Sequence, residues 1–251
     1  MAIDLEAIRK KLQGLQTTTT RTSNLWKPEP GKNQVRIVPY QYDKDNPFQE
    51  LFFHYGLGKR NYLSPTTFGE TDPVVEFADK LKQTGNRDDW TLAKGLTPKM
   101  RTYVPVLVRG QESEGVKLWG FGKTVYQELL TFIADPDYGD ITDLKAGRDI
   151  TVTFTPAEGQ ERFPKTAIMV KPNQSPATED KTIAENIMNG QEDLMNIFKK
   201  VSYDDLKAAL EEWLNPSEGG EGQEASPSPI PAGVKKTDDI DTAFDDLFND
   251  K

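Results

Sequence analysis

The chain has 251 residues, with 31 Lys and Arg against 40 Asp and Glu, which gives a formal net charge of −9. It contains no cysteine and a single histidine, His54, which excludes disulfides, thiolate metal sites, cysteine nucleophiles and multi-histidine metal sites. No run of about 18 apolar residues is present, and the N-terminus carries no apolar segment, so neither a transmembrane helix nor a secretion signal is expected. Taken as a sum, the acidic charge argues against a nucleic-acid partner.

The charge is distributed unevenly along the chain. Residues 1–178 hold 24 bases and 22 acids, a net of +2, whereas residues 179–251 hold 7 bases and 18 acids, a net of −11. A near-neutral body with an acidic C-terminal third is therefore compatible with a polyanionic partner, and the total of −9 conceals this.

Residues 1–27 are interpreted as a basic N-terminal arm. Apolar residues at helical spacing predict a short amphipathic helix over 2–15, with Arg9, Lys10 and Lys11 on or beside its polar face. The Thr-rich run 16–24, which includes Arg21, predicts an extended linker. The alternative interpretation of the arm is a frayed terminal helix with solvated charges.

Alternating or aromatic-rich runs predict several strands, and helical spacing predicts two helices between them. The predicted strands are 34–40, 48–55, 59–63, 99–108, 116–121, 149–155 and 166–171, and the predicted helices are 73–82 and 123–134. Pro105 inside the strand 99–108 suggests a sheet edge or a bulge.

This order of elements predicts the α+β class, with a mainly antiparallel OB-fold-type β-barrel core that carries inserted and C-terminal helices over residues 28–215. An unrelated α+β sheet domain fits the strand count nearly as well. Short helices are also expected over 180–189 and 192–198, and a helix over 202–214 begins at a capping Ser202.

Residues 216–251 are expected to form a disordered linker followed by an acidic tail, because the run after Pro216 is rich in Gly, Pro, Ser and Glu. The end of the tail differs, since Ile240, Phe244, Leu247 and Phe248 recur at helical spacing among six aspartates. We expect this segment to dock on proteins. The residues assigned to this interaction are Asp239, Asp241, Phe244, Asp245, Asp246, Leu247 and Phe248.

The sequence offers weak signals for an enzyme. It has no Walker-type phosphate loop, and the runs 56–58 and 120–122 lack the context of a nucleotide-binding fingerprint. The adjacent acidic pairs are expected to be solvated or capping residues, and His54 to be a hydrogen-bonded structural group. We therefore expect no catalytic residues.

Interleaved basic and aromatic residues are more informative, because single-stranded nucleic acid is held by cations on its phosphates and aromatic rings on its bases. Period two on strands places Arg101 with Tyr103, and Lys117 with Trp119. The alternative is that the aromatic residues form the core, as Phe121 and Tyr126 easily could. The residues assigned to DNA binding from this pattern are Lys59, Arg60, Tyr62, Arg87, Trp90, Lys94, Lys99, Arg101, Tyr103, Lys117, Trp119, Phe121 and Lys123.

The collinear order of several motifs resembles the gene thirty-two family, the helix-destabilising single-stranded DNA-binding proteins of T-even-like phages, and most closely members from phages of cyanobacteria. The motifs are the basic arm with its Thr run, VRIVP (35–39), FFHYG (52–56), DPVVEFADK (72–80), WTLAK (90–94), KMRTYVPVLV (99–108), VKLWGFGK (116–123) and the tail DDIDTAFDDLFND (238–250).

The resemblance implies an OB-fold core that binds single-stranded DNA with little sequence preference in phage replication, recombination and repair, within the cytoplasm of an infected bacterium. It implies that Arg9, Lys10, Lys11 and Arg21 serve cooperative binding between neighbouring protomers. It also implies that the acidic tail recruits replication and recombination proteins and competes with DNA. Cleft positions of the family fall here on Trp90, Lys94, Tyr103, Trp119 and Phe163.

One departure concerns zinc, which the best-known member of the family binds through one His and three Cys. The His position matches His54, but the Cys positions align roughly with Leu63, Asp72 and Val75, which supply no thiolate. We therefore expect no metal or other cofactor. Apolar packing of Val74, Val75, Phe77 and Leu81 is expected to stabilise this region.

The alternative function is an acidic protein-interaction adaptor that makes no direct contact with nucleic acid. Convergence of the basic-aromatic pairs on one cleft would favour DNA binding, and scattered pairs would favour the adaptor.

Overall fold

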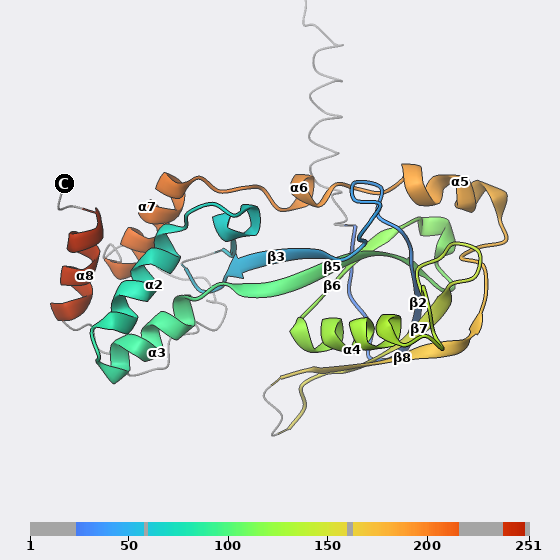
Figure 1. Cartoon of the computed structure of the whole chain (residues 1–251), viewed down its shortest axis with the longest axis horizontal. Coiled ribbons are helices and arrows are strands. Elements are labelled where there is room, and N and C mark those ends of the chain that lie inside the picture. Colours follow the sequence, from blue (N-terminus) through green and yellow to red (C-terminus); the bar gives the residue numbers. More distant parts are fainter. Residues whose placement is uncertain (1–23, 58–59, 160–162, 216–237, 249–251) are drawn as a thin grey trace, which may run out of the picture. The chain divides into compact units, whose positions relative to one another are not determined.

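The structure is a computed structural model that describes residues 24–57, 60–159, 163–215 and 238–248 (Figure 1). The chain divides into two compact units. The sheet unit comprises Met1–Gln49 and Tyr103–Asp193, and the helical unit comprises Glu50–Thr102 and Leu194–Lys251. The basic arm, apart from residues 24–27, lies outside the described residues, as does the expected linker over 216–237.

The strands form a sheet in the order β1-β6-β5-β2-β7-β8, while β3 pairs with β4 and β5. Neighbours β2/β5, β2/β7, β7/β8 and β3/β4 are antiparallel, and the short β1 runs parallel to β6. The α+β class with a mainly antiparallel sheet is therefore confirmed, and the pairing is that of an open sheet. The strands are β1 Leu25–Trp26, β2 Gly31–Ile37, β3 Gln49–His54, β4 Tyr62–Leu63, β5 Lys99–Val108, β6 Lys117–Phe121, β7 Arg148–Thr155 and β8 Lys165–Gln174.

The helices lie between and after the strands, and several begin at a capping residue visible in the sequence. The side chain of Asp72 accepts from the backbone N–H of Val74 and Val75 at the start of α2, and Ser202 caps α7 in the same way. The helices are η1 Pro65–Phe68, α2 Pro73–Gln83, α3 Arg87–Leu96, η2 Glu112–Glu114, α4 Lys123–Ala134, α5 Lys181–Asn189, α6 Leu194–Ile197, α7 Tyr203–Leu214 and α8 Asp238–Phe248. None of the described helices is long and apolar enough to cross a membrane.

The core of the sheet unit forms where the apolar faces of its strands meet α4. Residues alternate along β7, so that Ile150 and Val152 are fully buried while Thr151 and Thr153, the residue after each of them, are partly exposed. Helix α4 contributes Val125 and Leu129 to the same core. Large aromatic residues complete it, namely Trp26, Phe48, Trp119 and Phe121.

The helical unit has a separate core that α2, α3, α7 and α8 build together. Helix α2 buries Val74, Phe77, Ala78 and Leu81 on one face, as its helical spacing predicts. Apolar packing of Val74, Phe77 and Leu81 in this region is therefore confirmed, whereas Val75 lies outside the buried cluster.

Three features of the structure differ from the sequence predictions. Strand β5 lies between β6 and β2, so Pro105 is neither at a sheet edge nor at the end of the sheet, and its carbonyl accepts from the N–H of Val38 at 3.1 Å. Helix α3 is missing from the prediction, although Asn86 caps it and Asp88 and Asp89 lie in its first turn. The end of the acidic tail, residues 238–248, forms α8 and buries Ile240 and Phe244 within its own chain, a contact that the sequence analysis did not predict.

Candidate nucleic-acid interface

The residues that the sequence assigns to DNA binding fall in both units. The helical unit carries Lys59, Arg60, Tyr62, Arg87, Trp90, Lys94, Lys99 and Arg101, of which Lys59 lies outside the described residues. The sheet unit carries Tyr103, Lys117, Trp119, Phe121, Lys123 and Phe163.

Helix α3 presents a tryptophan and a lysine together on its exposed face. Trp90 is 51% exposed, and the ammonium of Lys94, four residues later, lies 5.4 Å from the centre of its ring. The opposite face of α3 buries Leu92, Ala93 and Leu96, which fixes the direction of the exposed face. An exposed ring beside a cation is the pair of groups that stacks on an unpaired base and contacts its phosphate.

A second pair of this kind lies at β4. The guanidinium of Arg60 is 4.8 Å from the ring centre of Tyr62 and also makes a hydrogen bond to this side chain. Arg60 is exposed and Tyr62 is half-buried. The order and spacing of these residues along the chain predict the pair, and the structure brings them into contact.

Arg101 is exposed but contacts a different aromatic residue from the one predicted. Its side chain hydrogen-bonds Tyr55, whose pKa burial raises above the ordinary value while Arg101 opposes that rise. The expected partner, Tyr103, is 6% exposed. A Cβ added at Gly120 would lie 2.5 Å from the Tyr103 ring, so glycine at this position makes room for the ring. Arg87 and Lys99 are exposed in the helical unit.

In the sheet unit, the aromatic residues of β6 belong to the core. Trp119 is 1% exposed and Phe121 4% exposed, and the Trp119 ring makes an edge contact with Trp26 at a centroid distance of 5.7 Å. The prediction that Lys117 and Trp119 form one exposed pair is therefore wrong for this structure. The physical reason is that the strand places both large rings on its inner face. There, their removal from water stabilises the fold more than an exposed position would.

The cations of β6 and α4 remain at the surface. Lys117 forms an ion pair with Glu114, and Lys123 is exposed at the start of α4. Lys117 also lines a cavity of about 790 Å³ within the sheet unit. The charged residues that line this cavity are Lys27, Glu29, Lys32, Arg109, Glu114 and Lys117.

Phe163 precedes β8 and is 69% exposed, the largest exposure among the large apolar side chains that the structure describes as exposed. On β8 itself, Met169 is 67% exposed. Of the aromatic residues assigned to DNA binding in the sheet unit, Phe163 is exposed, whereas Tyr103, Trp119 and Phe121 are buried.

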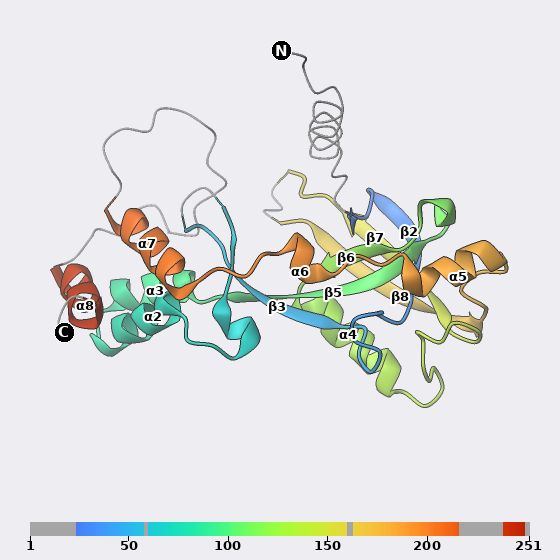
Figure 2. The same ribbon diagram turned by 90° about the horizontal axis from the view of Figure 1, so that it is seen from above.

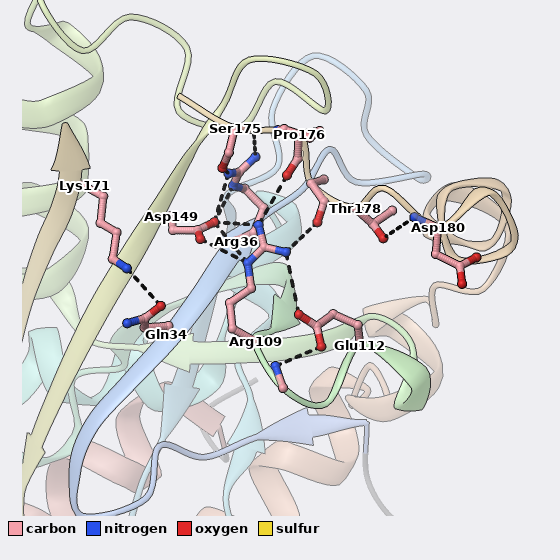
Figure 3. Close-up of polar contacts among 12 residues, drawn as sticks. Gln34, Arg36, Arg109, Glu112, Asp149, Lys171, Ser175, Pro176, Thr178 and Asp180 are labelled. Carbon is pink, nitrogen blue, oxygen red and sulfur yellow. Dashed lines mark hydrogen bonds and ion pairs between the residues drawn. The ribbon is translucent and has the colours of Figure 1, made fainter. Parts of the chain in front are cut away.

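A buried ionic cluster, which the sequence analysis did not single out, ties the end of β8 to the sheet (Figure 3). Arg36 is fully buried, and its guanidinium contacts Asp149 Oδ1 at 2.9 Å and donates to the carbonyl of Ser175 at 2.8 Å. Arg109 approaches the same carboxylate at 2.8 Å and donates to the carbonyl of Ala177 at 2.6 Å. Burial lowers the pKa of Arg36, and the Asp149 carboxylate acts in the opposite direction.

His54 holds several segments of the helical unit together. Its Nδ1 lies 2.8 Å from the carbonyl oxygen of Leu96, and its Nε2 lies 2.8 Å from Asp72 Oδ2, which also accepts from Ser64. Each ring nitrogen thus lies within hydrogen-bond distance of an oxygen atom. Burial raises the pKa of Asp72, but the hydrogen bonds of His54 and Ser64 and the His54 charge outweigh it, so this pKa lies below its ordinary value.

The residues around His54 do not fit the zinc site that the family resemblance implies. Of the aligned positions, Leu63 and Val75 have no donor atom, and Asp72 already bonds to His54 itself. Across the part of the chain that the structure describes, no cluster of three or more His, Asp or Glu side chains is arranged to hold a metal ion.

A mainly antiparallel α+β domain that exposes cations beside aromatic rings fits the class of single-stranded nucleic-acid-binding proteins. Residues 29–214, well over half of the chain, match the family model described as "gp32 DNA binding protein like". The chain therefore belongs to this family of single-stranded DNA-binding proteins, which confirms the resemblance to the family, whereas the likeness to members from phages of cyanobacteria stays a prediction. Among curated proteins, a search finds no match.

Proposed function

We propose that this protein binds single-stranded DNA without marked sequence preference, using exposed cation–aromatic pairs to hold phosphates and bases. The observation that carries the proposal is the Trp90–Lys94 pair on α3, inside the region that matches the DNA-binding family. Arg60 with Tyr62, exposed Phe163 and the cationic cavity of the sheet unit offer further contacts of the same chemistry. The match to a DNA-binding family gives less support to an adaptor without DNA contact.

The test is a fluorescence titration with oligo-dT at several salt concentrations. Of the four tryptophans, Trp90 is 51% exposed, Trp213 is partly buried against the core of the helical unit, and Trp26 and Trp119 are buried, so DNA should quench mainly Trp90. Trp90→Ala should remove most of the quenching and weaken binding by about 1–3 kcal/mol, the loss of one base–aromatic stack. Tyr42→Ala, which truncates an equally exposed ring not assigned to binding, is the matched control. Equal losses in both variants would contradict the assignment.

We further propose that the arm, through Arg9, Lys10, Lys11 and Arg21, mediates cooperative binding along DNA. Removal of residues 1–16 should abolish cooperativity on a long strand and leave the affinity for a short oligonucleotide nearly unchanged. Equal weakening on both lengths would assign the arm to DNA contact and not to protomer contact.

The acidic tail is proposed to recruit replication and recombination proteins and to compete with DNA for cationic surfaces. Replacing Asp239, Asp241, Asp245 and Asp246 by Asn removes four negative charges and keeps the apolar residues of α8. This variant should bind DNA more tightly at low salt and lose the difference at high salt, because screening weakens the competition. Unchanged affinity at low salt would oppose the competing role.

We propose that the protein acts without zinc or another cofactor, as a non-enzymatic component of phage DNA replication, recombination and repair in the cytoplasm of its bacterial host. The His54–Asp72–Ser64 network and the apolar core support a fold that needs no metal. A strong chelator should leave the thermal unfolding midpoint unchanged. A fall in this midpoint that added zinc reverses would contradict the proposal.

A further inference from the structure

The end of the acidic tail does not stand free of the helical unit. In α8, Ile240 is 2% exposed and Ala243 and Phe244 are each 6% exposed, whereas Thr242 is exposed. These three buried residues belong to the same apolar cluster as Phe77 and Leu81 of α2 and the apolar face of α7. The tail helix therefore buries one face in the core of this unit, and Figure 2 shows its ribbon beside α2.

The surface that receives α8 is made by α2 and α7. Phe77 of α2 makes an edge contact with Phe244 at a centroid distance of 6.0 Å. Leu206 and Leu210 of α7 are fully buried in the same cluster. The hydroxyl of Tyr203 donates to Glu76 Oε2 at 2.6 Å, which fixes the start of α7 to α2. We call this surface the α2–α7 face.

The α2–α7 face matches an amphipathic helix with apolar residues at positions i, i+3 and i+4, the spacing of Ile240, Ala243 and Phe244. At the end of α8 the ring of Phe248 packs on Phe244 at 4.8 Å, and the ammonium of Lys207 lies 4.8 Å from the Phe248 ring centre. Five of the eleven residues of α8 are aspartate. The positive charge of Lys207 attracts an acidic helix, and its contact with the Phe248 ring favours an aromatic residue at the end of that helix.

We propose that the α2–α7 face is a docking site for an acidic amphipathic helix and that its resident occupant is α8 of the same chain. The 23 residues between α7 and α8 can span at most about 75 Å, so the chain can reach its own α2–α7 face. In the docked state Ile240 and Phe244 are covered, and any protein that binds the apolar side of the tail must first release α8. This consequence rests on the proposed recruiting role of the tail, whereas the docking itself does not.

The test is hydrogen exchange of α8 in the full-length chain without DNA. Wild-type amides over 240–248 should be protected. Phe244→Asp should raise their exchange by about 100-fold, because a large buried ring is lost and a carboxylate is introduced into an apolar contact. Thr242→Asp is the matched control, since it adds the same carboxylate on the exposed side of the same helix, and its effect should stay within about threefold. Wild-type exchange at the rate of an unstructured peptide would overturn the proposal.

A milder variant guards against a general loss of structure in Phe244→Asp. Lys207→Gln removes the cation over Phe248 and should accelerate exchange of α8 by about two- to fivefold, without changing the exchange of α3. If α8 and α3 lose protection equally, the effect is not specific to docking and the proposed contact is wrong.

The same experiment over a roughly hundredfold range of protein concentration identifies the occupant. Protection that does not depend on concentration, in a monomeric sample, supports docking within one chain. Protection that rises together with a dimer assigns the α2–α7 face to the tail of a second copy and overturns the proposal. Because DNA is absent throughout, DNA binding and tail docking can each fail independently.

Discussion

The helical unit and the sheet unit carry similar mixtures of cations and aromatic residues but hold them in different ways. In the helical unit, Trp90 is half-exposed with Lys94 beside its ring. In the sheet unit, Trp119 and Phe121 are buried while Lys117 pairs with Glu114. A basic-aromatic pattern therefore indicates a DNA-binding surface only after the aromatic rings are shown to lie outside the core.

The difference follows from what each element needs to bury. A short amphipathic helix such as α3 buries Leu92, Ala93 and Leu96 and leaves the other side free for a large ring. A strand inside a sheet packs its largest side chains against a core, and β6 supplies Trp119 and Phe121 for this purpose. The two units therefore expose different combinations of cations and aromatic rings.

The largest effect is expected from a variant that breaks the ionic cluster of the sheet unit. Arg36→Ala should destabilise this unit by about 3 kcal/mol, the lower end for a broken buried ion pair, because Arg109 still neutralises Asp149. Segment-resolved hydrogen exchange should show lost protection in β7 and β8 and little change in α2 and α7. Arg109→Ala removes a partly exposed partner of the same carboxylate and should cost less. Equal loss in both units would show that they unfold together.

A smaller effect is expected from the His54 network of the helical unit. Asp72→Asn should destabilise this unit by about 1.5–3 kcal/mol, since hydrogen bonds to a charged group are lost. The pKa of Asp72 lies below its ordinary value of 3.8, so its contribution is present above that pH and is lost as the pH falls through the lower value of the folded state. The stability of the wild type should therefore contain a contribution that disappears as the pH falls, and Asp72→Asn should lack it. Acid unfolding of the two proteins measures this difference. Identical pH profiles would contradict this role.

The two units can be compared directly through one lysine from each. Lys94→Gln should reduce the slope of log affinity against log salt by about 0.7, the value for one phosphate contact on a single strand. Lys117→Gln should reduce it by less, because Lys117 already pairs with Glu114. Titrations of both variants with the same oligonucleotide measure this difference. A larger effect at Lys117 would place the main DNA contact on the sheet unit.

The smallest predicted effect concerns Thr102 on β5. Its hydroxyl is buried and finds no hydrogen-bond partner among the described residues. Thr102→Val keeps the shape and removes the unsatisfied hydroxyl, so stability should stay the same or rise by up to about 1 kcal/mol. Thermal unfolding measures the change, and a clear loss of stability would mean that the hydroxyl has a partner in solution.

Much of the secondary structure follows from local patterns in the sequence. The helices α2 and α4 begin and end within about one residue of the predicted ranges, because apolar spacing and capping act over a few residues. Asn86 and the following aspartates mark the start of α3, and this signal was available in the sequence. The contact between Lys94 and the Trp90 ring follows from α3, which places residues four apart on one side of the helix and which the sequence prediction lacked.

Other properties depend on residues far apart in the chain. The sequence shows Arg36 as a polar position of a strand, but its partners Asp149 and Ser175 come from β7 and the end of β8. Burial of Trp119, the interior position of Pro105 and the docking of Phe244 on Phe77 likewise depend on which strands and helices become neighbours.

By itself the sequence determined the class of the fold, most of its elements, the family and the absence of thiolate ligands. These properties follow from composition, local periodicity and short motifs. Only the tertiary structure decided which aromatic rings face solvent, that His54 bonds to Asp72, and that the acidic tail buries its apolar side on α2 and α7. Burial and pairing are set by long-range contacts, and local sequence patterns leave several such arrangements open.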